Sequence, residues 1–262
     1  MRTGEQPTAL ITGSARGLGS MTAVILAEAG WAVALNYRRD EKAAQSLCNR
    51  LKEAGRRAEI FRGDLTRREE VDALVRGVFS RFGRVDALIH AVGPFIRERR
   101  RFADYTPEEI DELIDGNFRS ALHVANAVLP HMRRQGGGRI IFFGFGRAAE
   151  APAWPDRAVY AAAKTGLVSF VKSVAVEEAS FGITVNMVCP GDIVGENKEK
   201  RIHEVIGERD DETPRGRPGS GEDVARVIRF LCEPASDFIT GNIINVTGGL
   251  DVIYPFSKAM KK

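Results

Sequence analysis

A tyrosine and a lysine four residues apart, Tyr160 and Lys164, are the pair in this chain best suited to chemistry. Side chains at positions i and i+4 of a helix are neighbours, so both groups would share one helix face. An ammonium group stabilises a phenolate, which would lower the tyrosine pKa from about 10 towards neutrality. Such a phenol can act as a general acid towards a developing alkoxide. Many such pairs are only surface residues, so the interpretation depends on other motifs.

The elements that would position this pair alternate between strand-like and helical patterns, which is typical of βαβ units and a parallel sheet. The predicted strands are 8–12, 31–36, 58–61, 86–91, 139–144, 183–189 and 242–246. The predicted helices lie near 17–29, 40–54, 67–82, 107–133, 159–180 and 222–232, and the fourth begins at a predicted N-cap, Thr106. We therefore predict one α/β domain over residues 1–262, with a doubly wound, seven-stranded parallel sheet and helices on both faces.

Composition excludes several other classes of protein. The 262 residues are 44% hydrophobic and 28% charged, and we find no apolar run of the length that a membrane span needs. The first residues lack the apolar core of a secretory signal, so we expect a cytoplasmic protein. Cys48, Cys189 and Cys232 are odd in number and lack metal-ligand spacing, so we expect no disulfide and no metal site. A net charge of +3 does not indicate nucleic-acid binding.

A glycine-rich turn joins the first predicted strand to the first predicted helix, in the segment Thr12-Gly13-Ser14-Ala15-Arg16-Gly17-Leu18-Gly19. Glycines let the backbone approach a pyrophosphate, and the free N–H groups of a helix N-terminus attract its charge. The spacing is G-x3-G-x-G, which differs from the general G-x-G-x-x-G fingerprint of dinucleotide-binding folds. The turn therefore predicts a phosphate-binding loop.

With these motifs the chain resembles the short-chain dehydrogenase/reductase family, in the branch that includes bacterial 3-oxoacyl-acyl-carrier-protein reductases of fatty acid biosynthesis. The resemblance covers nearly the whole chain. It is carried further by Gly63-Asp64-Leu65, Asn117-Phe118-Arg119-Ser120, Asn186-Met187-Val188-Cys189-Pro190-Gly191, and Ile239-Thr240-Gly241-Asn242 leading to Thr247-Gly248-Gly249. It implies a single Rossmann domain, a nicotinamide cofactor, hydride transfer to or from a carbonyl, and homo-oligomers, usually tetramers.

The resemblance also implies roles for individual residues. Tyr160 would be the proton donor, and Lys164 would bind the nicotinamide ribose. Asn117 would hold a water in a proton relay, although a helix-interior asparagine can instead bond only the backbone. Asp64 would accept a hydrogen bond from the adenine amino group, or alternatively cap the following helix. The complete predicted cofactor-binding set is Gly13, Ser14, Arg16, Gly17, Leu18, Gly19, Asn36, Tyr37, Arg38, Asp64, Leu65, Ala91, Gly93, Tyr160, Lys164, Pro190, Gly191 and Ile193.

The charges near the end of the second strand favour NADPH/NADP+ over NAD. A site for NAD usually has an acidic residue there, whereas the 2′-phosphate of NADP needs cations. The strand here ends in Asn36-Tyr37-Arg38-Arg39, and the first acid is Asp40. Arg16 and Arg38 are the two residues expected to reach the 2′-phosphate.

Three departures from the family pattern affect the catalytic end. The family serine about thirteen residues before the tyrosine is missing; Phe145 or Arg147 takes its place, depending on the direction of counting. Gly144, Gly146 or Arg147 would then have to supply a hydrogen bond to the substrate carbonyl. The usual Asn-Asn-Ala-Gly is His90-Ala91-Val92-Gly93, where His90 is expected to brace adjacent strands. The threonine expected to hold the nicotinamide carboxamide is Gly195, which leaves that role to backbone groups of Ile193.

The remaining segments bear on the substrate. Residues 195–218 are expected to form a charged lid, and the basic segment 97–101 lies near the expected site entrance. That segment and a second cluster, Arg133, Arg134 and Arg139, could attract an acyl carrier protein or another acidic substrate. We therefore predict an NADPH-dependent reductase of 3-oxoacyl thioesters, held on acyl carrier protein or CoA. The alternatives are a pteridine or other ketone reductase, and a weakly active protein that binds NADP(H) as a sensor or interaction partner.

Overall fold

Seven parallel strands form one sheet in the order β3-β2-β1-β4-β5-β6-β7, which confirms the predicted fold class. The computed structural model describes residues 6–253. The strands are β1 (Thr8–Thr12), β2 (Ala32–Tyr37), β3 (Ala58–Arg62), β4 (Ala87–His90), β5 (Gly138–Phe143), β6 (Ile183–Pro190) and β7 (Ile243–Val246). The order reverses between β1 and β4, and ligands of doubly wound folds bind outside the carboxyl ends of the strands at such a point.

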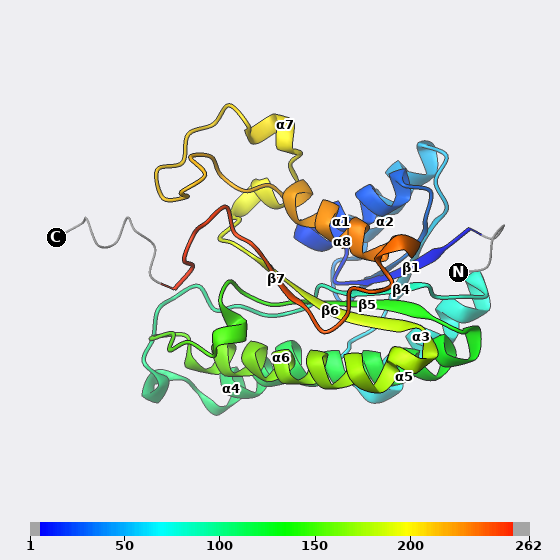
Figure 1. Cartoon of the computed structure of the whole chain (residues 1–262), viewed down its shortest axis with the longest axis horizontal. Helices are drawn as coiled ribbons and strands as arrows, with labels where there is room; N and C mark the ends of the chain where they lie inside the picture. The colour runs from blue at the N-terminus through cyan, green and yellow to red at the C-terminus, as the bar shows by residue number, and fades with distance from the viewer. Residues whose placement is uncertain (1–5, 254–262) are drawn as a thin grey trace.

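Helices cover both faces of the sheet, as predicted (Figure 1). One layer contains α1 (Gly17–Glu28), α2 (Glu41–Glu53) and α8 (Gly221–Cys232), and the short α7 (Ile202–Val205) lies beyond it. The other contains α3 (Arg68–Phe82), α4 (Pro107–Ile114), α5 (Ser120–Gln135) and α6 (Ala158–Glu178). Residues alternate between these layers along a strand. In β1, Leu10 packs in the core under α3, α5 and α6, whereas Ala9 and Ile11 pack under α1, α2 and α8.

The predicted continuous helix over 107–133 is wrong in its middle. The capping box between Thr106 and Glu109 starts α4 as predicted, but a π-helical turn (Asp115–Arg119) separates α4 from α5. The turn contains Asn117, whose amide Nδ2 donates to the carbonyls of Pro94 (2.8 Å) and Leu113 (3.0 Å). Such π-bulges are common at functional sites because they displace one residue from the regular helical face.

The segment Ala158–Phe181, which comprises α6 and the short turn after it, is long and apolar enough to cross a membrane by those criteria alone. Half of it is buried within the domain, where it packs against β6 and α4. It is therefore a core helix of the sheet's covering layer, and it carries Tyr160 and Lys164 near its start.

Candidate active site

Tyr160 lies in a cluster of aromatic rings at the carboxyl end of the sheet. Its ring centroid is 4.9 Å from Phe95, 6.0 Å from Trp154 and 6.1 Å from Phe145. Burial raises the pKa of the phenol above its usual range, and the Cys189 thiol raises it further. The expectation that Lys164 would lower this pKa is therefore wrong for the protein by itself, because the surrounding rings remove water that would stabilise a phenolate.

Lys164 and Asn117 converge on Gly93, which lies in the loop that follows β4. A Cβ added to Gly93 would lie 2.4 Å from Asn117 Oδ1 and 3.0 Å from Lys164 Nζ, so only glycine fits there. Asn117 Oδ1 is buried without a hydrogen-bond partner among the described residues. Burial lowers the pKa of Lys164 to about 8, against a smaller opposing effect of Cys189. A free acceptor and an ammonium group therefore both lie close to Gly93, where the resemblance implies a water relay.

The glycine turn joins β1 to α1 as predicted, and the side chain of Asn36 supports it through hydrogen bonds. The start of α1 packs closely on the turn at Gly19, where an added Cβ would lie 2.6 Å from the Gly13 carbonyl oxygen. Asn36 Oδ1 accepts from the Gly13 N–H (3.4 Å), while its Nδ2 donates to the Gly63 carbonyl (3.2 Å). Because this buried side chain is bonded inwards, Asn36 supports the loop, and its predicted contact with the cofactor remains untested.

An internal carboxylate lies at the N-terminus of α1. Glu199, in the 3-10 turn Gly195–Glu199, accepts a hydrogen bond of 2.5 Å from the Gly17 N–H. Helix N-termini attract anions through free N–H groups and the helix dipole. The carboxylate thus stands in for the anionic phosphate group that the motif predicts, and the site fits such a group. Nothing in the sequence indicated that the predicted lid would supply this anion.

The two arginines expected at a 2′-phosphate are both paired with acids. Arg16 forms an ion pair with Asp40, which also caps α2 by accepting from the Ala43 N–H (3.0 Å). Arg38 Nη1 lies 3.7 Å from Asp64 Oδ2. Burial opposes ionisation of Asp64, but hydrogen bonds from Thr66 and the charge of Arg38 lower its pKa overall. Asp64 forms a turn with Thr66, and the N-cap of α3 is Arg67, so the capping alternative is wrong.

The loop after β5 shows what replaces the missing serine. Phe145 is buried and packs 4.9 Å from Trp154, so an aromatic side chain fills this position. Arg147 donates to Glu150 (2.8 Å) and Asp251 (2.7 Å), and these acids raise its pKa. The Gly144 N–H donates to the Val188 carbonyl (2.9 Å). Gly146 is a buried residue, and among residues 6–253 its N–H has no acceptor, which leaves it as the unused donor of the three candidates.

His90 braces the sheet, as its position predicted. Its Nδ1 lies 3.1 Å from Thr12 Oγ1 on β1, and its Nε2 lies 3.2 Å from Ser120 Oγ on α5. Ser120 donates its own proton to the Gly116 carbonyl, so it accepts from Nε2–H, and Thr12 donates to Nδ1. Burial lowers the pKa of His90 to about 3, and the charge of Lys164 lowers it further, which keeps the ring neutral.

Arg157 holds the loop before α4 close to Tyr160. Its guanidinium donates to the backbone carbonyls of Arg97 and Glu98 and lies 5.0 Å from the Phe95 ring centroid. This buried arginine thereby ties the loop to the start of α6 and places Phe95 against Tyr160.

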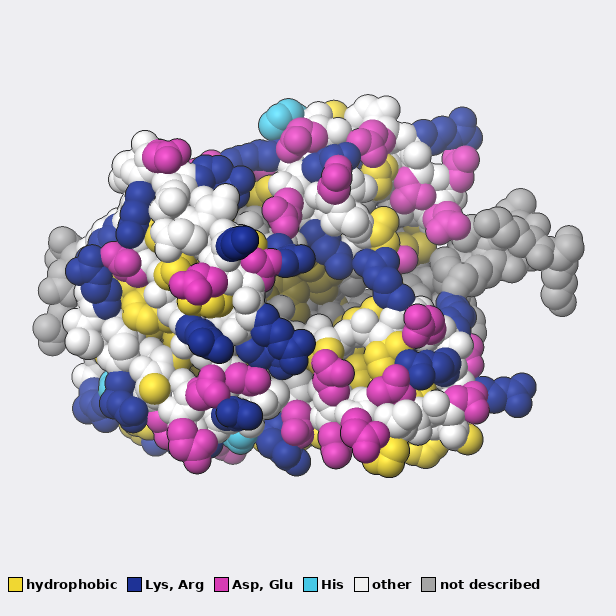
Figure 2. Space-filling model, turned by 180° about the vertical axis from the view of Figure 1, so that it is seen from behind, with side chains coloured by type: hydrophobic (Ala, Val, Ile, Leu, Met, Phe, Trp, Pro, Cys, Tyr) yellow, Lys and Arg dark blue, Asp and Glu magenta, His cyan; other side chains and the backbone are white. Residues whose placement is uncertain are grey.

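The back of the molecule is hollowed, with hydrophobic side chains at the floor and charged side chains around the rim (Figure 2).

The remaining predicted residues are distributed as follows. Ile193 is buried and its N–H donates to the Gly191 carbonyl (2.9 Å), so only its carbonyl is left for a ligand. Cys48, Cys189 and Cys232 are buried free thiols, and within 6–253 no three His, Cys, Asp or Glu side chains form a metal-binding group. The proximity of Cys189 to Tyr160 was missed, since the sequence showed only an isolated thiol. In the predicted second basic cluster, Arg139 is buried, which corrects its place there, whereas Arg134 and the Glu178-paired Arg133 are exposed.

Comparisons with known proteins agree with this geometry. Residues 13–251 match a family described as "Enoyl-(Acyl carrier protein) reductase". The chain is 47% identical over 248 residues to "Putative oxidoreductase YtkK" of Bacillus subtilis, covering 94% of this chain and 96% of that protein. It is 33% identical over 243 residues to the 3-oxoacyl-[acyl-carrier-protein] reductase FabG of Staphylococcus aureus, covering 93% and 97% of the two chains.

Solved structures show the same similarity. "Structure of putative 3-oxoacyl-reductase from bacillus thuringiensis" superposes with a TM-score of 0.87 at 43% identity, covering 95% of this chain and all of the other. An acetoin dehydrogenase from Enterobacter cloacae superposes with a TM-score of 0.84 at 27% identity, covering 97% and 99% of the two chains. These relatives share the whole domain with this chain.

Proposed function

Because the chain belongs to the short-chain dehydrogenase/reductase family of oxidoreductases, we propose that it is an NADPH-dependent carbonyl reductase acting on 3-oxoacyl thioesters. The observation that carries the proposal is the convergence of Lys164 and Asn117 on Gly93, one helical turn from Tyr160. A protein that only binds a nucleotide has no need for a buried proton-relay geometry. The named activity of the Staphylococcus aureus relative supports 3-oxoacyl groups as the substrate class.

The protonated phenol of Tyr160 is the form that carbonyl reduction requires of a proton donor. The phenol keeps its proton at neutral pH, so it can donate to the alkoxide oxygen that develops at the carbonyl. When bound, the reduced nicotinamide supplies the hydride for this step. Lys164 and the free Oδ1 of Asn117 would return a proton to the phenol through water.

The carbonyl would be oriented by the Gly146 N–H in place of the serine hydroxyl. This donor belongs to a buried residue and is unpaired within the described part of the chain, on the loop that also carries Phe145. Preorganised backbone N–H groups stabilise developing oxyanions in other enzymes. Phe145, Phe95 and Trp154 would enclose the apolar part of the substrate next to the phenol.

NADPH is proposed over NADH because Arg16 and Arg38 flank the end of β2. A 2′-phosphate would replace Asp40 and Asp64 as their partner. The test is the ratio of kcat/KM for NADPH to that for NADH in wild type and in Arg38→Asp. The ratio should exceed one and fall at least tenfold in the variant; an unchanged ratio would contradict the assignment.

The activity is tested by NADPH oxidation with a 3-oxoacyl-CoA, the same acyl group on acyl carrier protein, diacetyl, a pteridine and an enoyl-CoA. We expect the highest kcat/KM for the 3-oxoacyl thioesters, and Tyr160→Phe should lower turnover at least a hundredfold while NADPH still binds. Preference for diacetyl or the pteridine would indicate another ketone reductase, and preference for the enoyl thioester would indicate C=C reduction. Tight NADPH binding without turnover on any of them would indicate the sensor alternative.

An acidic carrier protein is the proposed partner at the site entrance. Within the basic segment 97–101, Arg100 pairs with Glu109, whereas Arg97, Arg99 and Arg101 are exposed. Arg99→Glu should raise KM for the carrier-bound substrate severalfold and leave KM for the CoA substrate nearly unchanged, since local charge reversal weakens long-range attraction. An equal effect on both substrates would point to a role in the site itself.

We propose that the protein forms a homo-oligomer, either a tetramer or a dimer, because two aromatic side chains are exposed on its surface. Phe230 on α8 is 50% exposed and Phe238, in the segment between α8 and β7, is 99% exposed. Exposed aromatic groups of this kind are typical of protein interfaces. Light scattering after size exclusion should give a mass above that of one chain, and Phe238→Ser should lower it; a monomeric wild type would contradict the proposal.

A further inference from the structure

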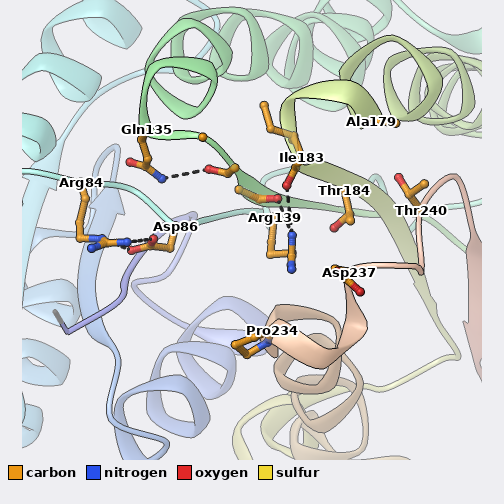
Figure 3. A pocket seen from close by; sticks show the side chains of 14 residues that line it. Arg84, Asp86, Gln135, Arg139, Ala179, Ile183, Thr184, Pro234, Asp237 and Thr240 are labelled. Atoms are coloured by element: carbon orange, nitrogen blue, oxygen red, sulfur yellow. Dashed lines mark hydrogen bonds and ion pairs between the residues drawn. The ribbon is translucent and has the colours of Figure 1, made fainter. Parts of the chain in front are cut away.

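A cavity of about 600 Å³ opens at the end of the sheet opposite Tyr160 (Figure 3). Its wall includes the first residues of β5 and β6, together with the segment that follows α8. The charged side chains that face it are Arg84, Asp86, Arg139 and Asp237, and the hydroxyl groups are those of Thr184 and Thr240. None of these residues belongs to the candidate active site.

Arg139 is a buried cation without a carboxylate partner among residues 6–253. Its side chain is enclosed in this wall, and the residue is only 7% exposed. Nη1 donates to the carbonyls of Gly138 (3.2 Å) and Gly182 (3.4 Å). In the part of the chain that the structure describes, Nε and Nη2 make no hydrogen bond and the guanidinium makes no ion pair; Nε is fully enclosed, whereas Nη2 is not. Figure 3 shows one guanidinium nitrogen directed to the carbonyls and the other directed towards the side of the cavity where Pro234 and Asp237 lie.

The other charges at the cavity do not neutralise this cation. Asp86 is engaged by Arg84 (2.6 Å) and by the Thr8 N–H (2.8 Å). Asp237 is exposed at the rim and forms no ion pair with Arg139 among the described residues, although its charge partly offsets the effect of burial on the Arg139 pKa. Burying a charge without a partner is unfavourable, because the charge loses its hydration. Burial accordingly lowers the pKa of Arg139.

Two hydroxyl groups line the same cavity as the guanidinium. Arg139 and Thr184 are direct register partners on the parallel strands β5 and β6, so their side chains leave the same face of the sheet. The Thr184 hydroxyl has no hydrogen bond among the described residues. Thr240 Oγ1 accepts from the Val185 N–H (3.0 Å), which leaves its proton available to a ligand. A cation and two hydroxyl donors are the chemistry that recognises oxyanions.

We propose that this cavity binds a small organic oxyanion, a carboxylate or a phosphate group, through Arg139 and the hydroxyl groups of Thr184 and Thr240. The cavity exceeds the volume of one phosphate ion, so the ligand is a small metabolite that carries the anionic group. The site lies at the opposite end of the strands from Tyr160. It is therefore independent of the proposed reductase activity.

The test is thermal unfolding and calorimetric titration of the unliganded protein with inorganic phosphate, with citrate, and with sodium chloride at matched ionic strength. Wild type should show a saturable rise in Tm with phosphate or citrate beyond that with chloride, and this rise should be lost in Arg139→Gln and at least halved in Thr184→Val. Because salting-out stabilisation acts equally on all variants, it cancels in this comparison. A response to citrate alone would show that the anionic group of the ligand is a carboxylate, and a response to phosphate alone would show that it is a phosphate.

Arg38→Ala is the matched control, since phosphate could instead bind near the glycine turn. Loss of the response in Arg38→Ala but not in Arg139→Gln would place the anion there and overturn the proposal. Equal stabilisation of wild type and Arg139→Gln, or no response beyond chloride, would overturn it as well. Should Arg139→Gln fail to fold, Thr184→Val and Arg139→Lys carry the same comparison, with Arg139→Lys expected to retain part of the response.

Discussion

The carboxylate of Glu199 accepts a hydrogen bond from the backbone N–H of Gly17, across 182 positions of sequence. Gly17 is the first residue of α1, and Glu199 ends the 3-10 turn of the predicted lid segment. The hydrogen bond therefore joins the predicted lid segment to the helix terminus where the proposed cofactor would place its pyrophosphate. Binding of the cofactor has to displace this carboxylate.

Glu199→Gln should tighten NADPH binding about three- to tenfold, because the neutral amide competes less with a pyrophosphate for the helix N-terminus. The dissociation constant can be measured by fluorescence titration of NADPH. Glu196→Gln changes an exposed acid of the same turn and should leave the constant nearly unchanged. Weaker binding by Glu199→Gln would mean that the carboxylate orders the site instead of blocking it.

Gly146→Pro should lower turnover about 10²–10³-fold, the loss typical of removing one oxyanion donor. Gly146→Ala retains the N–H and is its matched control. Arg147→Ala should keep turnover within about threefold, because its guanidinium is already committed to Glu150 and Asp251. A large loss in Arg147→Ala with an unaffected Gly146→Pro would reverse this assignment of the donor.

Lys164→Met should stabilise the unliganded protein while abolishing turnover. Burial lowers the pKa of Lys164 from its usual 10.5 to about 8, which corresponds to about 3 kcal/mol of cost below pH 8, where both the folded and unfolded chains hold the proton. Between these two values the unfolded chain binds more protons, so wild-type stability rises with pH and the advantage of the variant shrinks. Urea unfolding at pH 7 and 9.5 measures this difference, and Lys172→Met, on the exposed face of α6, should show none.

His90→Asn should remove part of the acid sensitivity of the fold. The histidine pKa falls from 6.5 to about 3 on folding, so below pH 6.5 the unfolded chain takes up a proton that the native chain does not. Wild type therefore loses up to about 1.4 kcal/mol of stability per pH unit from this group as the pH falls towards 3. Unfolding free energies at pH 7, 5.5 and 4.5 should show a shallower decline in the variant, and exposed His203→Asn should follow wild type. Parallel declines would show that His90 is not the titrating group.

Much of the fold was predictable because its signals are local. No predicted strand end differs from the observed end by more than one residue, since buried parallel strands are apolar runs bounded by turn residues. The π-helical turn was not predictable, because it depends on Asn117 bonding Pro94 from a distant loop. The short α7 also escaped prediction, as four residues carry no periodic signal.

For the site, residue types and spacing were sufficient to determine which side chains could take part, namely Tyr160, Lys164, Asn117 and the glycine turn. Tertiary structure alone decided their environment. Phe95, Phe145 and Trp154 surround the phenol and raise its pKa where spacing had predicted a decrease. The physical reason is that helical neighbours follow from a four-residue spacing, whereas desolvation and the charge at a helix terminus depend on atoms that only the folded chain brings together.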